Sequence, residues 1–105
     1  MSTHLMIFTT CPEDQAFVIA KSLVEERLVA CVNMVAGVRS VYYWRDRLDT
    51  ATETLLIIKA TTHHYDKIEE RLRALHPYEL PEIIAIPIER GYEPYLDWLQ
   101  GPARG

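Results

Sequence analysis

The sequence predicts an α+β fold, in which helices cover one face of an antiparallel sheet, and three observations support this. Short apolar runs rich in β-forming residues alternate with stretches whose apolar residues recur at helical spacing. In one region, 31–48, polar and apolar residues alternate with period two, and a second strand with a continuous apolar run follows at 52–61. The chain of 105 residues has the size of one domain, so residues 1–105 are expected to form a single unit.

The first strand and the first helix are expected before residue 30. Residues 4–10 form a short apolar run, which indicates a strand buried on both faces. Pro12 can open a helix, and the acidic residues that follow it suit a helix N-terminus. The residues expected to pack on the sheet repeat at helical spacing, and they are Phe17, Ala20, Val24 and Leu28.

A long β-hairpin is predicted in the middle of the chain, with a polar turn over 45–51. Ser40, Tyr42 and Trp44 share one face of its first strand, and Gly37 indicates a bulge or a bend. Each arm can exceed ten residues, against a usual strand length of roughly five or six. One small domain cannot cover so long a hairpin, so another copy of the chain is expected to cover it.

The remaining segments complete the fold. Thr62 can cap a second helix, which ends before Pro77. A short strand follows at 83–86, and Pro94 opens a terminal helix with an aromatic face. The order strand, helix, strand, strand, helix, strand is that of a ferredoxin-like split βαβ sandwich, here with a long β-hairpin and a short C-terminal helix.

Composition and charge exclude several classes of function. A net charge of −4 and scattered basic residues argue against a nucleic-acid partner. No apolar run is long enough to span a membrane and the first residues lack the features of a signal peptide, so a cytoplasmic protein without a membrane partner is expected. Cys11 and Cys31 are too few and too far apart for a disulfide framework, so both are expected as reduced thiols in the core.

The most distinctive stretch is the loop 76–82, which lies between a helical pattern and an apolar strand. Pro77 and Pro81 stiffen this loop, because each proline fixes its own backbone and restricts the residue before it. His76, Tyr78 and two glutamates therefore point in defined directions, which suits chemistry or an interface. The alternative is that His76 simply ends the helix, where the helix dipole favours it.

Lys59 stands in an apolar strand, so its ammonium must reach solvent or find a carboxylate, either Glu53 or Glu82. A structural ion pair is one interpretation, and a ligand-binding lysine in a crevice between subunits is the other. The residues expected to line this ligand pocket are Tyr42, Trp44, Lys59, Tyr78 and Glu82. For the aromatic residues, cover of a subunit interface is the alternative use.

A thiolate and an imidazole, those of Cys31 and His76, would together suit copper or zinc. The sequence has no Cys-x-x-Cys and no histidine pair four residues apart, and the adjacent His63 and His64 point about 100° apart on a helix. A metal site would have to be assembled from distant segments or from different subunits. The alternative is a buried Cys31 without a binding role, since free cysteines favour cores.

Four segments carry a family resemblance, at 28–33, 40–44, 76–82 and 95–99. In order and spacing they resemble the CutA family, the divalent-cation tolerance proteins. The resemblance implies a ferredoxin-like homotrimer held by its long hairpins, a link to copper and other divalent cations, and no established reaction. Cys31 and His76 lie within these motifs. Cys11 stands directly before Pro12, at the start of the first helix, whereas in bacterial relatives that have a cysteine here it tends to lie at the end of the first strand, so no metal role is carried over to Cys11.

Three functions are considered. The first is divalent-cation tolerance in response to metal ions, with copper or another divalent cation bound by a homotrimer, without an organic cofactor and without enzymatic activity. The second is a trimeric small-molecule-binding signalling module that takes a small anion at Lys59. The third, an enzyme with Cys31 as nucleophile and His76 as base, ranks last because no orienting group or oxyanion site can be named. The residues expected at the trimer interface are Tyr43, Trp44, Tyr95 and Trp98.

Overall fold

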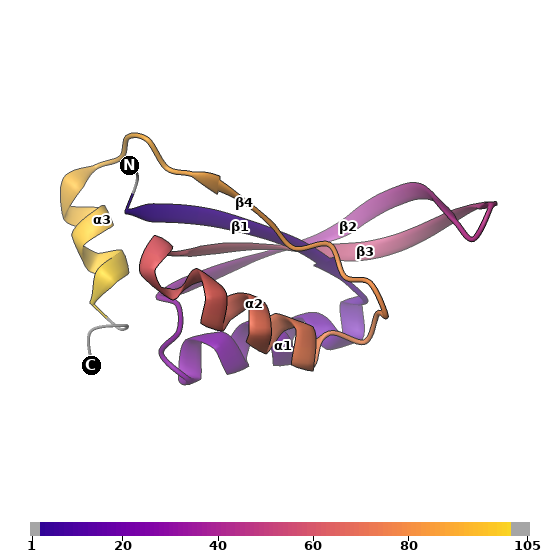
Figure 1. Ribbon diagram of the computed structural model, residues 1–105, viewed down its shortest axis with the longest axis horizontal. Helices are drawn as coiled ribbons and strands as arrows, with labels where there is room; N and C mark the ends of the chain where they lie inside the picture. The colour runs from indigo at the N-terminus through magenta and orange to yellow at the C-terminus, as the bar shows by residue number, and fades with distance from the viewer. Residues whose placement is uncertain (1–2, 102–105) are drawn as a thin grey trace.

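A four-stranded antiparallel sheet with two long helices on one face forms the body of the protein in the computed structural model, which describes residues 3–101 (Figure 1). The elements are β1 His4–Cys11, α1 Glu13–Glu25, β2 Cys31–Trp44, β3 Arg47–Thr61, the 3₁₀ turn η1 Thr62–His64, α2 Tyr65–Leu75, β4 Ile84–Pro87 and α3 Glu93–Gln100. The sheet order is β2-β3-β1-β4, with every neighbouring pair antiparallel. The predicted α+β class and order of elements are confirmed.

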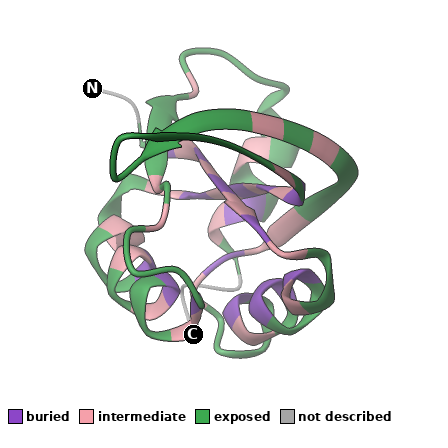
Figure 2. Cartoon of the chain, turned by 90° about the vertical axis from the view of Figure 1, so that its right-hand side faces the viewer, coloured by how far each residue is buried: buried purple, intermediate pink, exposed green. Residues whose placement is uncertain are grey.

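The hydrophobic core lies between the sheet and the layer of α1 and α2. Figure 2 shows the buried segments of the strands and helices facing each other, while the hairpin is exposed along most of its length. Each large core side chain contributes about 1.5–3 kcal/mol by its removal from water. The residues of this core are Ile7, Cys11, Ala16, Ile19, Leu23, Val29, Leu56, Ile58, Ala60, Ile68 and Leu72.

The opposite face of the sheet is not covered by α1 or α2. Met6 and Phe8 of β1 lie on this face, directly across from Ile86 and Ile84 of β4. Met6 and Phe8 are half-buried, whereas Ile84 and Ile86 are 56% and 50% exposed. We call this surface, with Ile57 of β3, the open sheet face. The expectation of a first strand buried on both faces is therefore wrong for the single chain, because Met6 and Phe8 on the open side are only half-buried.

Helix α1 turns a different face to the sheet than the sequence predicts. Ala16, Ile19 and Leu23 are buried, while Phe17 is 60% and Val24 40% exposed. The prediction is thus wrong for Phe17 and Val24. Both stripes of α1 are apolar at helical spacing, so periodicity alone does not choose between them, and packing against the sheet buries the stripe with Ile19 and Leu23.

Helix α2 also begins later than predicted. Thr62 starts the 3₁₀ turn, and α2 itself runs from Tyr65 to Leu75 without a side-chain cap on its first turn. The prediction that Thr62 caps α2 is therefore wrong. Among residues 3–101, no helix combines the length and the apolar character needed to cross a membrane.

The β2–β3 hairpin closes with a two-residue turn, shorter than the predicted turn at 45–51. Trp44 pairs directly with Arg47, so only Arg45 and Asp46 connect the strands, with φ of 52° and 64°. Positive φ at both positions defines a turn whose twist matches that of the strands. Gly37, at φ 78°, lies where the register of β2 and β3 shifts, which confirms the predicted bulge.

We expect Asp46→Gly to stabilise the protein, because an L-residue in the left-handed region costs about 1–2 kcal/mol and glycine is spared most of this cost. The midpoint of urea unfolding measures the change. Asp49→Gly is the matched control, since the same substitution within β3 should lower the midpoint. An unchanged or lower midpoint in Asp46→Gly would contradict the assignment of strain to this turn.

Candidate functional site

A cluster of polar side chains lies where the loop after α2 meets the base of the hairpin. At its centre is Glu53, which is only 5% exposed. The Ser40 hydroxyl donates to Glu53 Oε1 at 2.6 Å, and the Tyr78 hydroxyl donates to Glu53 Oε2 at 2.7 Å. Such short contacts are typical of a hydroxyl and an ionised carboxylate. We call Ser40, Glu53, Tyr78 and the neighbouring Tyr42 the Glu53 cluster.

Two segments that are far apart in the sequence, the hairpin and the loop after α2, bring this cluster together. In the hairpin, Glu53 lies opposite Val38, and Ser40 follows on the same face of β2. Tyr78 comes from the loop, where Pro77 keeps His76 extended, at φ −76° and ψ 134°. The chain therefore leaves α2 abruptly and turns the Tyr78 side chain back towards the hairpin.

His76 serves the structure of this loop. Its backbone N–H donates to the carbonyl of Leu72, which ends α2. Its ring Nε2 lies 2.8 Å from the carbonyl oxygen of Thr10, and its Nδ1 lies 3.2 Å from the backbone nitrogen of Tyr78. A carbonyl only accepts and an amide N–H only donates, so these partners assign a neutral imidazole with its proton on Nε2. The interpretation of His76 as a helix-ending residue is supported, and a metal ion would have to displace one of these partners.

Two groups near Glu53 hold their protons tightly. The pKa of the Tyr78 phenol is raised, first by burial and then by its hydrogen bond to Glu53. Burial, followed by the negative charges of Glu53 and Asp14, raises the pKa of the Cys11 thiol to about 11. Cys11 is fully buried with its sulfur 3.8 Å from the carbonyl oxygen of Thr54, as expected for a small core residue.

The two predicted metal ligands lie apart in one chain. Cys31 is half-buried, and it pairs with Lys59 across the β2–β3 ladder. His76 contacts Thr10, which pairs with Leu55. Four residues of strand separate these two positions on β3, or roughly 13 Å. Within residues 3–101, no three His, Cys, Asp or Glu side chains are grouped so as to hold a metal ion.

The predicted ligand pocket is only partly assembled. Tyr42 and Tyr78 are neighbours, since Tyr42 contributes to the raised pKa of Tyr78. Lys59 lies elsewhere, with its Nζ 5.8 Å from the centre of the Tyr95 ring. The ion pair predicted for Lys59 with Glu53 or Glu82 is therefore not formed among the described residues. Sequence reasoning considered Glu53 only as a partner of Lys59 and so missed it as the centre of the cluster.

The aromatic residues predicted for a trimer interface are all accessible in the single chain. Trp44 lies under the Arg45 guanidinium, 5.4 Å from the ring centre, and the rings of Tyr95 and Trp98 stack at 5.7 Å. The exposed fractions are 75% for Tyr43, 39% for Trp44, 37% for Tyr95 and 52% for Trp98. These side chains are thus available for contact with a second chain.

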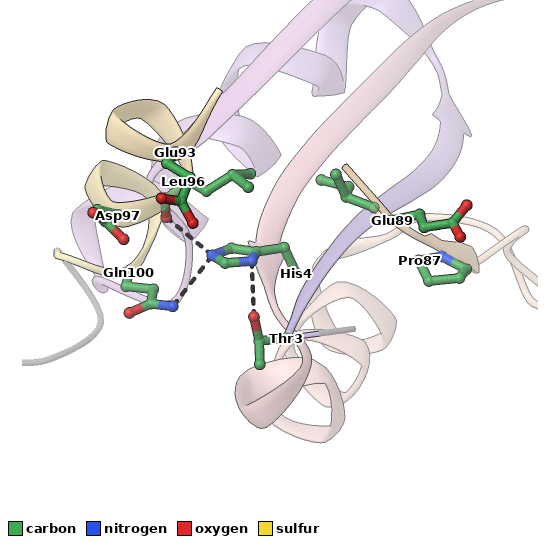
Figure 3. A pocket seen from close by; sticks show the side chains of 9 residues that line it. Thr3, His4, Pro87, Glu89, Glu93, Leu96, Asp97 and Gln100 are labelled. Carbon is green, nitrogen blue, oxygen red and sulfur yellow. Dashed lines mark hydrogen bonds between the residues drawn. The ribbon is translucent and has the colours of Figure 1, made fainter. Parts of the chain in front are cut away.

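A cavity of about 740 Å³ lies between α3 and the start of β1 (Figure 3). Its central side chain is His4, which is 7% exposed. The His4 ring lies 3.0 Å from the carbonyl oxygen of Leu96 and 2.9 Å from the hydroxyl of Thr3. These contacts join the strand to the terminal helix, so we assign His4 a structural role.

The difference between the two thiols predicts their reactivity. Iodoacetamide at pH 8 should modify Cys31 and leave Cys11 unmodified in the native protein, because the buried Cys11 stays a thiol until the pH approaches about 11. Mass spectrometry of native and urea-unfolded samples counts the adducts, and unfolding should expose both thiols. In Cys31→Ser, labelling should remain slow below that pH. Rapid native labelling of Cys11 would show that the thiol is accessible.

Comparison with known proteins identifies the family. The chain matches the family model described as CutA1 divalent ion tolerance protein over residues 5–101. It is 50% identical over 97 residues to the divalent-cation tolerance protein CutA of Thermus thermophilus, with 92% of this chain and 94% of that protein covered. The solved Thermus structure superposes with a TM-score of 0.88, over 91% of this chain and 94% of that one.

More distant relatives agree. The protein CutA homolog of Xenopus laevis is 44% identical over 88% of this chain, which spans 62% of that longer protein. A structure from Nostoc sp. PCC 7120, described as a PII-like protein CutA, is 34% identical with a TM-score of 0.90, and the match covers 94% of this chain and 96% of that one. The extent of the family match and the identity to the Thermus protein show that this chain belongs to the CutA1 divalent ion tolerance protein family.

Proposed function

We propose that the chain serves divalent-cation tolerance as a ferredoxin-like homotrimer that binds copper or another divalent cation between subunits. The observation that carries this proposal is the open sheet face. Its isoleucines on β4 are half-exposed beside the half-buried side chains of β1, and a surface of this kind is commonly covered by another chain. The identity of 50% to the divalent-cation tolerance protein CutA of Thermus thermophilus supports the link to divalent cations.

The metal part of the proposal rests on Cys31. Its thiol is half-buried, and it shares with Lys59 and Ile57 the side of the sheet that includes the open sheet face. Association through that face would bring metal-binding side chains of different subunits together. A single chain does not group enough of them within residues 3–101. A thiolate is a preferred ligand of Cu(I). His76 can join such a site only by giving up a present hydrogen bond. In this proposal the protein is a cytoplasmic binding protein, without enzymatic activity or an organic cofactor.

Calorimetric titration tests the metal site. Reduced protein titrated with Cu(I), and separately with Zn(II), should give saturable binding at a fixed ratio per subunit. Cys31→Ser should abolish this binding, and His76→Ala should weaken it if the imidazole is recruited. His63→Ala is the control, because it removes an exposed imidazole outside the site. Weak, non-saturating heats that are the same in all variants would show that the protein has no specific binding site for these cations, and that its link to cation tolerance is indirect.

Dilution tests the trimer. Trp44→Ala should weaken both assembly and folding, because deleting a large aromatic side chain from a buried position costs about 3–5 kcal/mol. Sedimentation equilibrium over a range of concentrations measures the association. Leu80→Ala, which shortens a loop side chain that is 71% exposed, is the control. A Trp44→Ala protein that remains fully trimeric on dilution would show that this part of the hairpin does not stabilise the subunit interface.

A second candidate function is a small-molecule-binding signalling module without direct metal chemistry. The Glu53 cluster favours it, since a nearly buried carboxylate between half-exposed tyrosines resembles a binding site more than a structural contact. The Nostoc structure described as PII-like also supports it. Ligand binding that depends on the Glu53 cluster or on Lys59, but not on Cys31, would distinguish this function from metal binding.

A further inference from the structure

Glu53 is a buried carboxylate without a countercharge. Its two oxygens accept hydrogen bonds from the neutral hydroxyls of Ser40 and Tyr78, and it forms no ion pair within residues 3–101. Each carboxylate oxygen can accept a further hydrogen bond. A buried charge that is not paired is costly, so such a group is expected to meet a cation in the working protein.

The charged side chains nearby do not supply this cation. Arg39 lies opposite Thr52, on the other face of the hairpin. Arg45 pairs with Glu79 at 2.9 Å, and Lys59 lies over the ring of Tyr95. On the face of β3 that carries Glu53, the next charged group towards the turn is the carboxylate of Asp49, which is no cation and lies four residues, or roughly 13 Å, along the strand.

Two tyrosine side chains that are partly exposed lie near the carboxylate. Tyr42 follows Ser40 on the same face of β2, and it is 40% exposed. Tyr78 is 38% exposed although its hydroxyl is engaged, so part of its ring remains accessible. The faces of aromatic rings attract cations, and a carboxylate next to two tyrosines is the combination that recognises organic ammonium groups.

We infer that the Glu53 cluster is a binding site for a cationic nitrogen group, an ammonium or a guanidinium. The group would sit against the free lone pairs of Glu53, between the rings of Tyr42 and Tyr78. One carboxylate and two hydroxyls whose protons are already donated form a poor ligand set for a divalent cation, whereas they suit an N–H donor. The inference rests on the second candidate function and reverses the ligand charge first expected, because Lys59 is absent from the cluster.

Titration with small probes tests this site. Butylammonium and agmatine should bind saturably to the wild-type protein and shift the NMR signals of the Tyr42 and Tyr78 rings, while butanoate, the anionic control, should not bind. Glu53→Gln preserves the shape of the side chain and should weaken binding of both cations at least tenfold. Asp49→Asn, which removes an exposed carboxylate on the same face, should have little effect. Tenfold weakening in Asp49→Asn as well would overturn the assignment to Glu53.

The cation can come from a free amine or from a lysine or arginine of a second copy of the chain. In the second case the probes do not bind. Glu53→Gln should then weaken assembly, so that the protein concentration below which the subunits dissociate rises at least tenfold. Asp49→Asn should leave this concentration unchanged. If neither probe binding nor assembly depends on Glu53, the inference is wrong. The wild-type NMR titration decides the matter for free amines even if Glu53→Gln does not fold. The outcome is distinguishable from that of the metal proposal, which depends on Cys31.

Discussion

The antiparallel pairing of β3 with β1 on one side and β2 on the other is the constraint on which the other features depend. β3 is the longest strand, and both of its ladders are continuous over most of their length. Because side chains alternate along a strand, one register sends Leu56 and Ile58 into the core and places Ile57 and Lys59 on the opposite side. A slip of one residue would exchange these two sets and bury the ammonium of Lys59 among the helices.

The features that depend on local chemistry could be predicted from the sequence. The element order followed from periodicity, the bulge at Gly37 from its tolerance of positive φ, and the stiff loop from its two prolines. The choice of buried face on α1 could not be predicted, because Phe17 and Ile19 belong to adjacent apolar stripes and only packing decides between them. The turn was predicted too long because Arg45 gives no sign of the positive φ that a two-residue turn requires.

The candidate site was harder to predict than the fold. Its central contact joins Glu53 to Tyr78, which are 25 residues apart and belong to different elements. Nothing in the sequence near Glu53 distinguishes a buried carboxylate from an exposed one in a hairpin. Lys59 was predicted to need a carboxylate or solvent because it interrupts an apolar run. Its ammonium instead lies over the ring of Tyr95 on α3. A charge within an apolar strand thus indicates that a partner exists but does not identify it.

The two candidate binding regions lie at different positions along the same long hairpin, and their chemistry differs. At the start of β2, Cys31 offers a soft sulfur beside Lys59, which would suit a metal such as Cu(I) rather than an organic cation. Near the bulge, Glu53 offers a hard, negatively charged group between aromatic rings. The β2–β3 ladder fixes the distance between the two regions, so neither can serve the other within one chain. Assembly through the open sheet face would bring other subunits to the first region, whereas the second already combines a buried charge with its donors in a single chain.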